Sequence, residues 1–498
     1  MNTWQRHLPK GLEASKVDLL AGETLPRIWV DQWRQHPQRD VIYDPKQGWV
    51  KSETLLTQSE VVAKRLAHAG VGPGDRVLLS ASTSVELVTA HVASLRLGAV
   101  VIPTNGAYRS EEVAHVVSDA RPTAAIVEQP EWQEWIRATD PKVVVTSPLV
   151  ELEEGPSVSL DEAGTDSPAL IGYTSGTTGR PKGAVLTHGN LLSSVRGLEI
   201  AWRWTSDDIL ILALPLFHMH GLGVGLHGSL TVGAQVVLLS EFDVDEVLNS
   251  INKFQATMFF GVPTMYGRLL DSENVSQLGQ LRLCVSGSAP LSAEVHQKIY
   301  DATGQQILER YGMTETAMLV SNPYQGERRP NSVGFPLPGV EVRLEGSPAE
   351  IQVKGPNVFK GYWERPDENR ASFDDGWFCT GDLGVVDSDG YLSISGRAKE
   401  LIISGGFNVY PKEVEDVVSQ HEAVQECAVV GVPDAQWGEA VVAFVVADRE
   451  IDSNELKNFV GERLAHYKRP QQTHRVDSLP RNALGKVQKH RLIEEPRT

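Results

Sequence analysis

The chain has 498 residues, is 41% hydrophobic and carries a net charge of −18. Because one hydrophobic core rarely serves more than about 250–300 residues, at least two domains are expected. The acidic balance argues against broad binding of nucleic acid or anionic membranes. The three cysteines, at positions 284, 379 and 427, are too scattered to indicate a disulfide framework or a cysteine metal cluster. With neither a signal-peptide pattern nor a run of about 18 apolar residues, the sequence predicts a cytoplasmic protein.

Short apolar runs alternate with amphipathic stretches through the first 300 residues. Strands are expected at 76–81, 99–103, 209–214 and 235–239, and a helix at 85–97. This β-α-β order predicts a mostly parallel α/β sheet. From about residue 340 the pattern changes, and the alternating segments 339–344 and 350–354 predict small antiparallel sheets or a barrel.

A second change in pattern lies at residues 396–399, and about a hundred residues follow it. A helix is expected from Pro411, since proline suits a first helical turn. Paired strands are expected at 428–432 and 440–446. The predicted fold class is therefore α/β, with a large N-terminal domain over 1–396, including a small β-barrel-like part, and a small α+β domain over 400–498.

The segment at 173–183, YTSGTTGRPKG, has the composition of a phosphate-binding loop. Glycine allows close approach of the backbone to a ligand, and hydroxyl and N–H groups can form a concave site for anionic oxygens. Lys182 adds a point charge. The segment is not the common P-loop, which requires Gly-Lys followed by Ser or Thr. Apolar residues on both sides predict that a strand leads into this loop and another leads out.

Six further segments supply groups that suit a nucleotide and an acid. They are PLFHMHG at 215–221, VSGSAPL at 285–291, ERYGMTET at 309–316, WFCTGDL at 377–383, GRAKELIISGGF at 396–407 and LPRNALGKV at 479–487. Tyr311 can stack on a purine, Thr314 can bind a phosphate, and Glu315 can hold Mg²⁺. Asp382, expected in a glycine-bounded turn, can accept ribose hydroxyls.

Together, and in this order over about residues 165–490, these segments resemble those of the acyl-adenylate-forming enzymes, which include acyl-CoA synthetases, luciferases and adenylation domains of peptide synthetases. The resemblance implies ATP, Mg²⁺ and CoA as cofactors and co-substrates. It implies catalytic roles for Lys486, Glu315, Thr174, Lys182 and His218. The implied ATP contacts are Thr174, Ser175, Gly176, Thr177, Thr178, Gly179, Lys182, Gly287, Ser288, Ala289, Tyr311, Gly312, Thr314, Asp382, Arg397 and Lys486.

The resemblance also implies an acyl site, a CoA passage and a hinge. The acyl residues would be His218, Arg282, Ser286 and Met313. Ser404, Gly405 and Gly406 would let the pantetheine arm pass. Lys399, within residues 397–399, would be the hinge about which the small domain rotates between the two half-reactions.

These parts suit conversion of a carboxylate to an acyl-adenylate, followed by thiol attack, because AMP is a far better leaving group than oxide. No carrier domain follows Lys486, which favours free CoA as acceptor. Three segments, 217–222, 309–316 and 331–339, most resemble malonyl-CoA synthetases, and Arg282 is expected to bind the distal carboxylate of malonate or methylmalonate. Medium-chain fatty acids and aryl acids remain alternatives, as do a luciferase-like enzyme and a silent nucleotide-binding protein. A monomer or a homodimer is expected.

Overall fold

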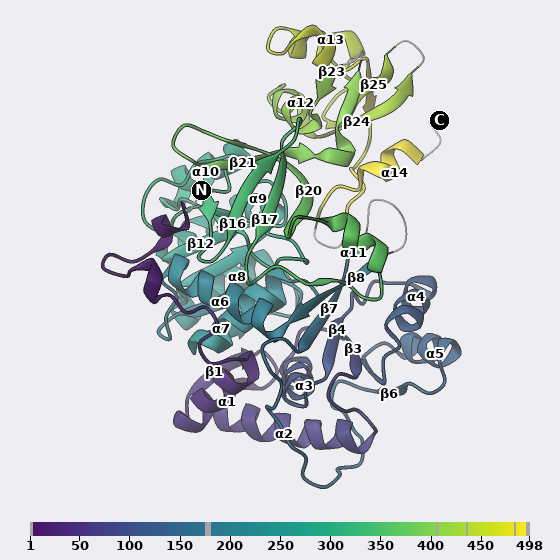
Figure 1. Cartoon of the computed structure of the whole chain (residues 1–498). Helices are drawn as coiled ribbons and strands as arrows, with labels where there is room; N and C mark the ends of the chain where they lie inside the picture. Colours follow the sequence, from purple (N-terminus) through teal and green to yellow (C-terminus); the bar gives the residue numbers. More distant parts are fainter. Residues whose placement is uncertain (1–2, 175–180, 405–406, 435–436, 483–484, 495–498) are drawn as a thin grey trace. The chain divides into compact units, whose positions relative to one another are not determined.

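The computed structural model describes residues 3–174, 181–404, 407–434, 437–482 and 485–494 (Figure 1). The chain forms two compact units, Met1–Val342 with Val353–Phe378, and Arg343–Gln352 with Cys379–Thr498. The second unit begins before the domain boundary expected at 396, because the 343–352 and 379–397 segments share a sheet and group with the C-terminal residues. The hinge at 397–399 lies inside that unit and stays a prediction.

A seven-stranded sheet in the first unit has the order β18-β8-β7-β4-β3-β5-β6. Strands β3 to β6 and β7 run parallel where they pair, whereas β7 and β8 form an antiparallel pair. Its strands are β3 (Arg76–Ser80), β4 (Val100–Pro103), β5 (Ala124–Val127), β6 (Val144–Thr146), β7 (Pro168–Thr174), β8 (Lys182–Thr187) and β18 (Gly361–Tyr362). The strands predicted at 76–81 and 99–103 are thus confirmed.

A nine-stranded sheet in the same unit has the order β15-β14-β13-β12-β11-β9-β10-β1-β2, with a parallel centre. Its strands are β1 (Asp40–Asp44), β2 (Gly48–Lys51), β9 (Ile209–Leu212), β10 (Gln235–Leu238), β11 (Met258–Gly261), β12 (Leu283–Ser286), β13 (Leu308–Tyr311), β14 (Val320–Ser321) and β15 (Phe335–Pro336). The carboxyl ends of parallel strands meet at one edge of a sheet, where ligands bind in such folds.

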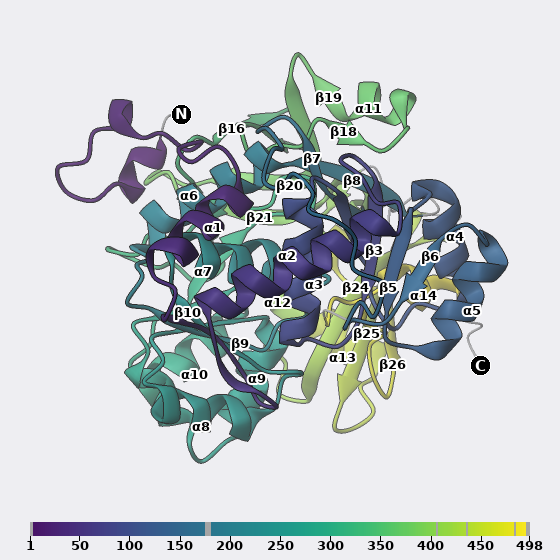
Figure 2. The same ribbon diagram turned by 90° about the horizontal axis from the view of Figure 1, so that it is seen from below.

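Helices cover the two sheets. They are α1 (Leu25–Gln35), α2 (Ser52–His68), α3 (Val85–Arg96), α4 (Ser110–Ala120), α5 (Pro130–Thr139), α6 (His188–Trp202), α7 (His227–Val232), α8 (Val244–Phe254), α9 (Pro263–Leu270), α10 (Ala293–Thr303) and α11 (Pro366–Ser372). Helices α2 and α3 lie side by side (Figure 2). Helix α3 is buried on all faces, as its apolar sequence requires. None of the described helices is long and apolar enough to cross a membrane.

The second unit contains a second core. Its chain includes β16 (Glu341–Glu345), β17 (Glu350–Lys354), β20 (Trp377–Val386) and β21 (Leu392–Arg397), which belong to one sheet. The short β19 (Phe373–Asp374) of the first unit pairs with Trp377 and Phe378 of the same unit. Beyond it lie β22 (Ile402–Ser404), β23 (Phe407–Val409), β24 (Val424–Asp434), β25 (Gly438–Ala447) and β26 (Gln472–Arg475), with α12 (Pro411–Val418), α13 (Ser453–Gly461) and α14 (Lys489–Glu494). The helix from Pro411 and the antiparallel pair β24–β25 confirm the prediction.

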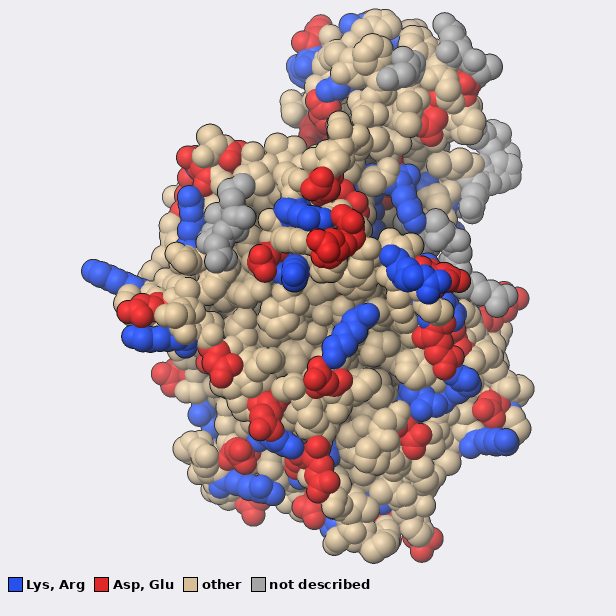
Figure 3. Space-filling model, in the orientation of Figure 1, with Lys and Arg blue, Asp and Glu red and all other residues tan. Residues whose placement is uncertain are grey.

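Acidic and basic side chains are interspersed over the face shown in Figure 3. This mixed surface accompanies a net charge of −18. Any site for an anionic ligand must therefore be built from local groups rather than from the overall field.

Candidate active site

The predicted phosphate loop joins two paired strands. Strand β7 ends at Thr174 and β8 begins at Lys182, with Thr174 opposite Lys182 and Tyr173 opposite Gly183. The Thr174 hydroxyl donates to the carbonyl of Lys182 at 3.4 Å. The loop therefore leaves and re-enters the sheet at one point. The predicted contacts at Ser175, Gly176, Thr177, Thr178 and Gly179 lie outside the described residues.

The 309–316 segment packs against β7, the strand that leads into the phosphate loop. A Cβ atom on Gly172 would lie 2.4 Å from Cγ2 of Thr314, so only glycine permits this approach. Thr314 follows β13, and Tyr311 is the last residue of that strand. The Thr314 side chain thus packs on the backbone of β7 just before the phosphate loop begins.

Tyr362 connects Glu315 with Lys182. Its hydroxyl donates to Oε1 of Glu315 at 3.0 Å, and the Lys182 ammonium lies 5.7 Å from the centre of its ring. Lys182 also lies 3.7 Å from a carboxylate oxygen of Glu368. The predicted metal-binding carboxylate and the predicted phosphate-binding cation therefore share one aromatic neighbour, which the sequence did not single out.

The chemistry at Glu315 fits Mg²⁺. Its side chain is buried and ionisable, and Mg²⁺ in nucleotide sites takes one or two carboxylates together with phosphate oxygens and water. Among the described residues, no group of three or more His, Cys, Asp or Glu side chains could hold a metal by itself. A metal at Glu315 would therefore take its other ligands from the nucleotide and from water.

The acyl side of the predicted site lies after β9. His218 follows this strand, and η3 (His220–Leu226), a π-helix, begins two residues later. A Cβ on Gly221 would lie 2.4 Å from the carbonyl of Pro215, which explains the glycine at this turn. Burial lowers the pKa of His218 to about 4 and that of His220 well below its usual value. Both imidazoles are therefore neutral at pH 7, and the Oγ of Ser288 lies 3.3 Å from Nδ1 of His220.

Two buried polar groups face this region without a partner among the described residues. They are the hydroxyl of Ser286, at the end of β12, and Nε and Nη2 of Arg310, on the neighbouring strand β13. Arg310 is 4% exposed, and a Cβ on Gly287 would lie 2.4 Å from its guanidinium carbon. Burial lowers the pKa of Arg310 to about 9, so it is still charged at pH 7. A buried cation without a counter-charge is costly unless an anion comes to it.

Arg282 is engaged elsewhere. Its guanidinium lies 2.6 Å from both carboxylate oxygens of Asp208 and donates to the carbonyl of Trp202 at 3.0 Å. It precedes β12, whereas Ser286 and Gly287 are at the other end of that strand. This geometry does not support the predicted contact of Arg282 with the acid, because the Asp208 carboxylate already neutralises it. The ion pair instead joins the starts of β9 and β12, and the bond to Trp202 ties the end of α6 to them.

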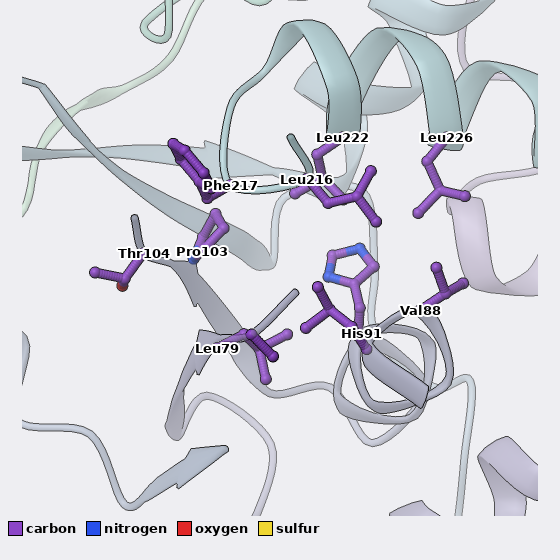
Figure 4. Close-up of a pocket in the computed structure, with 11 residues that line it drawn as sticks. Leu79, Val88, His91, Pro103, Thr104, Leu216, Phe217, Leu222 and Leu226 are labelled. Atoms are coloured by element: carbon purple, nitrogen blue, oxygen red, sulfur yellow. The ribbon is translucent and has the colours of Figure 1, made fainter. Parts of the chain in front are cut away.

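A small cavity lies beside the segment that carries His218. Its lining includes Leu79, His91, Thr104, Leu216, Phe217 and Leu222. Figure 4 shows the apolar side chains of Leu79, Leu216 and Leu222 beside the ring of His91. The free volume is about 20 Å³, room for roughly one water molecule. The Nε2 atoms of His91 and His227 lie 2.8 Å apart. The cavity as it stands does not hold an extended apolar chain.

In the second unit, Asp382 and Arg397 face each other on paired strands. The Arg397 Nε atom lies 2.9 Å from Oδ1 of Asp382, whose side chain is 5% exposed. The expectation of a turn at Asp382 is wrong: it lies within β20, and only the preceding Gly381 has a positive φ, of 72°. A bulge follows at Leu383 and Gly384. Asp382, the predicted ribose contact, and Arg397, a predicted ATP contact, are thus adjacent.

Lys486 lies in a turn held by its own neighbours. The Asn482 side chain accepts from the Lys486 amide at 3.0 Å, and three residues later Lys489 pairs with Glu415 at 2.7 Å and Glu400 at 3.3 Å. Lys486 as a residue is exposed, but neighbouring protein atoms crowd its ammonium. This loss of water and then repulsion from Arg397 lower the pKa of Lys486, while Asp382 and Glu400 oppose the shift.

The other predicted residues of the second unit follow β21 in the chain. Ser404 ends β22 and is fully buried, with no hydrogen-bond partner for its hydroxyl among the described residues. Lys399 lies in the short helical turn Ala398–Glu400. Gly405 and Gly406 lie outside the described residues, so the predicted CoA passage is not described.

Comparison with known proteins places these features in one family. The AMP-binding enzyme family matches residues 29–363, and the AMP-binding enzyme C-terminal domain matches 413–486. The chain is 33% identical to a long-chain-fatty-acid–CoA ligase of Bacillus subtilis over 96% of its length and 95% of the relative. It is 37% identical to a malonate–CoA ligase of Arabidopsis thaliana, over 86% and 79% respectively.

Solved structures agree with the observed fold. ATP-bound MatB from Rhodopseudomonas palustris superposes with a TM-score of 0.90 at 39% identity, covering 95% of this chain and 98% of that one. An o-succinylbenzoate CoA synthetase from Bacillus subtilis, in complex with ATP and a magnesium ion, gives a TM-score of 0.85 at 32% identity, covering 93% and 98%. The fold predicted from the sequence is therefore confirmed.

Proposed function

Because the chain belongs to the AMP-binding enzyme family and is an AMP-forming acid–CoA ligase that uses ATP, Mg²⁺ and CoA, we propose that its acid is malonate or methylmalonate. The observation that carries the proposal is the buried Arg310 guanidinium, two of whose nitrogens have no partner among the described residues. The Ser286 hydroxyl and Nε2 of His220 are likewise buried and without a partner there. A second carboxylate would satisfy this set of groups.

Charge balance favours a diacid over a simple fatty acid. A distal carboxylate that enters a partly desolvated site needs a cation, and a bidentate arginine is the strongest partner for it. An apolar tail would leave the Arg310 charge buried and uncompensated. Arg310 therefore replaces Arg282 as the proposed specificity residue, while Ser286 and His218 keep their proposed places beside the acid and Met313 lies in the loop between Tyr311 and Thr314.

The first half-reaction would use the residues already described. The acid carboxylate attacks the α-phosphorus of ATP, and pyrophosphate leaves. Thr174 and Lys182 would hold the departing phosphates, Tyr311 the adenine, Asp382 and Arg397 the ribose, and Glu315 the Mg²⁺. When bound, the metal would neutralise phosphate charge. Lys486 would stabilise negative charge that develops during this step.

The second half-reaction transfers the acyl group to CoA, and AMP leaves. We propose that the small C-terminal part turns about Lys399 between the two steps, so that Lys486 serves adenylation and the Ser404 segment serves thioester formation. The proposal includes a cytoplasmic enzyme that is a monomer or a homodimer. Gel filtration with light scattering would establish whether it is a monomer or a homodimer.

An acid panel tests the proposal. Purified protein is given ATP, Mg²⁺ and CoA with malonate, methylmalonate, butyrate, octanoate or benzoate, and the CoA products are measured by mass spectrometry. We expect malonyl-CoA or methylmalonyl-CoA with the highest kcat/KM, accompanied by AMP and pyrophosphate. Preference for octanoate or benzoate would support the fatty-acid or aryl-acid alternative instead. Absence of pyrophosphate release would indicate a silent nucleotide-binding protein, and light emission a luciferase-like enzyme.

A further inference from the structure

One helix outside the predicted site holds both flanks of the phosphate loop. His115 and Asp119 are four residues apart on α4, so they lie on the same face, about 6 Å apart along the axis. The Tyr173 hydroxyl, just before the loop, donates to Oδ2 of Asp119 at 2.7 Å. The Pro181 carbonyl, just after it, lies 2.8 Å from Nε2 of His115. The labels α4, β7 and β8 in Figure 1 locate the three elements.

Asp119 is itself held from a second direction. Arg365 pairs with its other carboxylate oxygen, and the Trp363 indole donates to its backbone carbonyl at 3.3 Å. The Asp119 side chain is 10% exposed. Each carboxylate oxygen thus has a separate donor, one from the loop flank and one from the segment after β18. Burial and the bond to Asp119 raise the pKa of Tyr173, so that its hydroxyl stays protonated as a donor.

The close packing around Tyr173 depends on a small residue. A Cβ on Gly183, the residue opposite Tyr173, would lie 2.5 Å from Cγ2 of Ile171. It would also lie 3.4 Å from the Tyr173 ring and 3.6 Å from Trp363. Glycine at this position therefore lets the hairpin close against the segment that carries Trp363 and Arg365.

We propose that Tyr173, held by Asp119, is a positioning residue for the flank before the 174–182 loop, as His115 is for the flank after it, so that Thr174 and Lys182 are set in place before pyrophosphate binds. This inference rests on the proposed role of that loop in adenylation. Fixing both flanks reduces the freedom that Thr174 and Lys182 would lose on binding, and such pre-organisation raises affinity without any new contact to the ligand. Tyr173 and Asp119 act through the loop and do not touch the acid.

The test removes one oxygen atom. In ATP–pyrophosphate exchange with the preferred acid, Tyr173→Phe should raise KM for pyrophosphate and for ATP about 10-fold, the effect of losing one hydrogen bond to a charged group. KM for the acid, and thioester formation from a supplied acyl-adenylate, should stay within twofold. Asp119→Asn keeps an acceptor for Tyr173 but loses the charge opposite Arg365, so we expect an effect of the same kind.

Glu364→Gln is the matched control. Glu364 pairs with Arg121 at the C-terminal end of α4, so it joins the same two segments but contacts neither flank of the loop. We expect wild-type constants. The positioning role is refuted if Tyr173→Phe behaves like this control. It is also refuted if kcat/KM falls equally for ATP, pyrophosphate and the acid, in parallel with the melting temperature. A wild-type protein that shows no exchange would instead refute the proposed function itself.

Discussion

Asp208 holds Arg282 through two contacts of 2.6 Å, and both residues precede strands of the nine-stranded sheet. The Asp208 side chain is 4% exposed and also accepts from the Thr257 hydroxyl at 2.7 Å. Burial raises the pKa of Asp208, but hydrogen bonds from Arg282, Thr205 and Thr257, together with the charge of Arg282, outweigh it and hold the pKa below its usual value. This pair is a structural ion pair, which separates the roles of Arg282 and Arg310.

Arg282→Met should reduce stability without changing acid preference. The substitution leaves Asp208 buried without its cation, and breaking a buried ion pair costs roughly 3–5 kcal/mol. We expect a lower urea midpoint and an unchanged ratio of malonate to butyrate kcat/KM. A ratio that falls while the urea midpoint is retained would return the specificity role to Arg282.

Arg310→Met should change acid preference. Methionine fills a similar volume but cannot pair with a distal carboxylate. We expect malonate kcat/KM to fall about 100-fold, since a hydrogen bond to a charged group contributes roughly 1.5–3 kcal/mol, while butyrate is used as well as before or better. Because Nε and Nη2 of Arg310 are buried without a partner among the described residues, stability should not fall as it does in Arg282→Met. Equal loss for both acids would contradict the proposed contact.

Lys486→Ala should slow adenylation by about 10²–10³, the usual effect of losing one group that stabilises transition-state charge. Thioester formation from a supplied acyl-adenylate should be nearly unchanged. Pyrophosphate release and CoA consumption are measured separately. Lys412→Ala is a control, because the Lys412 ammonium pairs with Asp416 one turn along α12 and belongs to none of the predicted site segments. Similar losses in both half-reactions would show that Lys486 acts through the structure of its turn.

Stability should fall between pH 7.5 and 5.5. Burial lowers the pKa of His7, His188 and His218 to about 4, and that of His91 to about 3. Below their usual value of 6.5, these histidines bind protons in the unfolded chain but not in the folded one, so acid favours unfolding. Each contributes about 1.4 kcal/mol per pH unit between its two pKa values.

Urea unfolding at the two pH values measures this effect. We expect a lower midpoint at pH 5.5, and the range stays above the titration of ordinary carboxylates. A midpoint that rises as the pH falls would contradict neutral burial of these histidines.

By itself, the sequence determined the fold class, the order of the strands along the chain and the segments that suit a nucleotide. These are local properties: apolar periodicity predicted β3, α3 and α12, and the glycines and hydroxyls of 173–183 indicated a loop between two strands. Residue type and spacing carry this information without any long-range contact. The turn expected at Asp382 was wrong because pairing of β20 with β21 extends a strand through it.

Only the tertiary structure decided which charged groups are already paired. Arg282 lies just before one predicted site segment and Arg310 lies inside another. Their neighbours in the sequence do not show which of the two is already paired. The ion pair with Asp208 joins residues 74 positions apart, and the contact of Tyr362 with Glu315 joins residues 47 apart. The bracing of Tyr173 by Asp119 depends in the same way on a helix 54 positions away. Burial and pairing arise when distant segments pack together, so they cannot be read from neighbours in the chain.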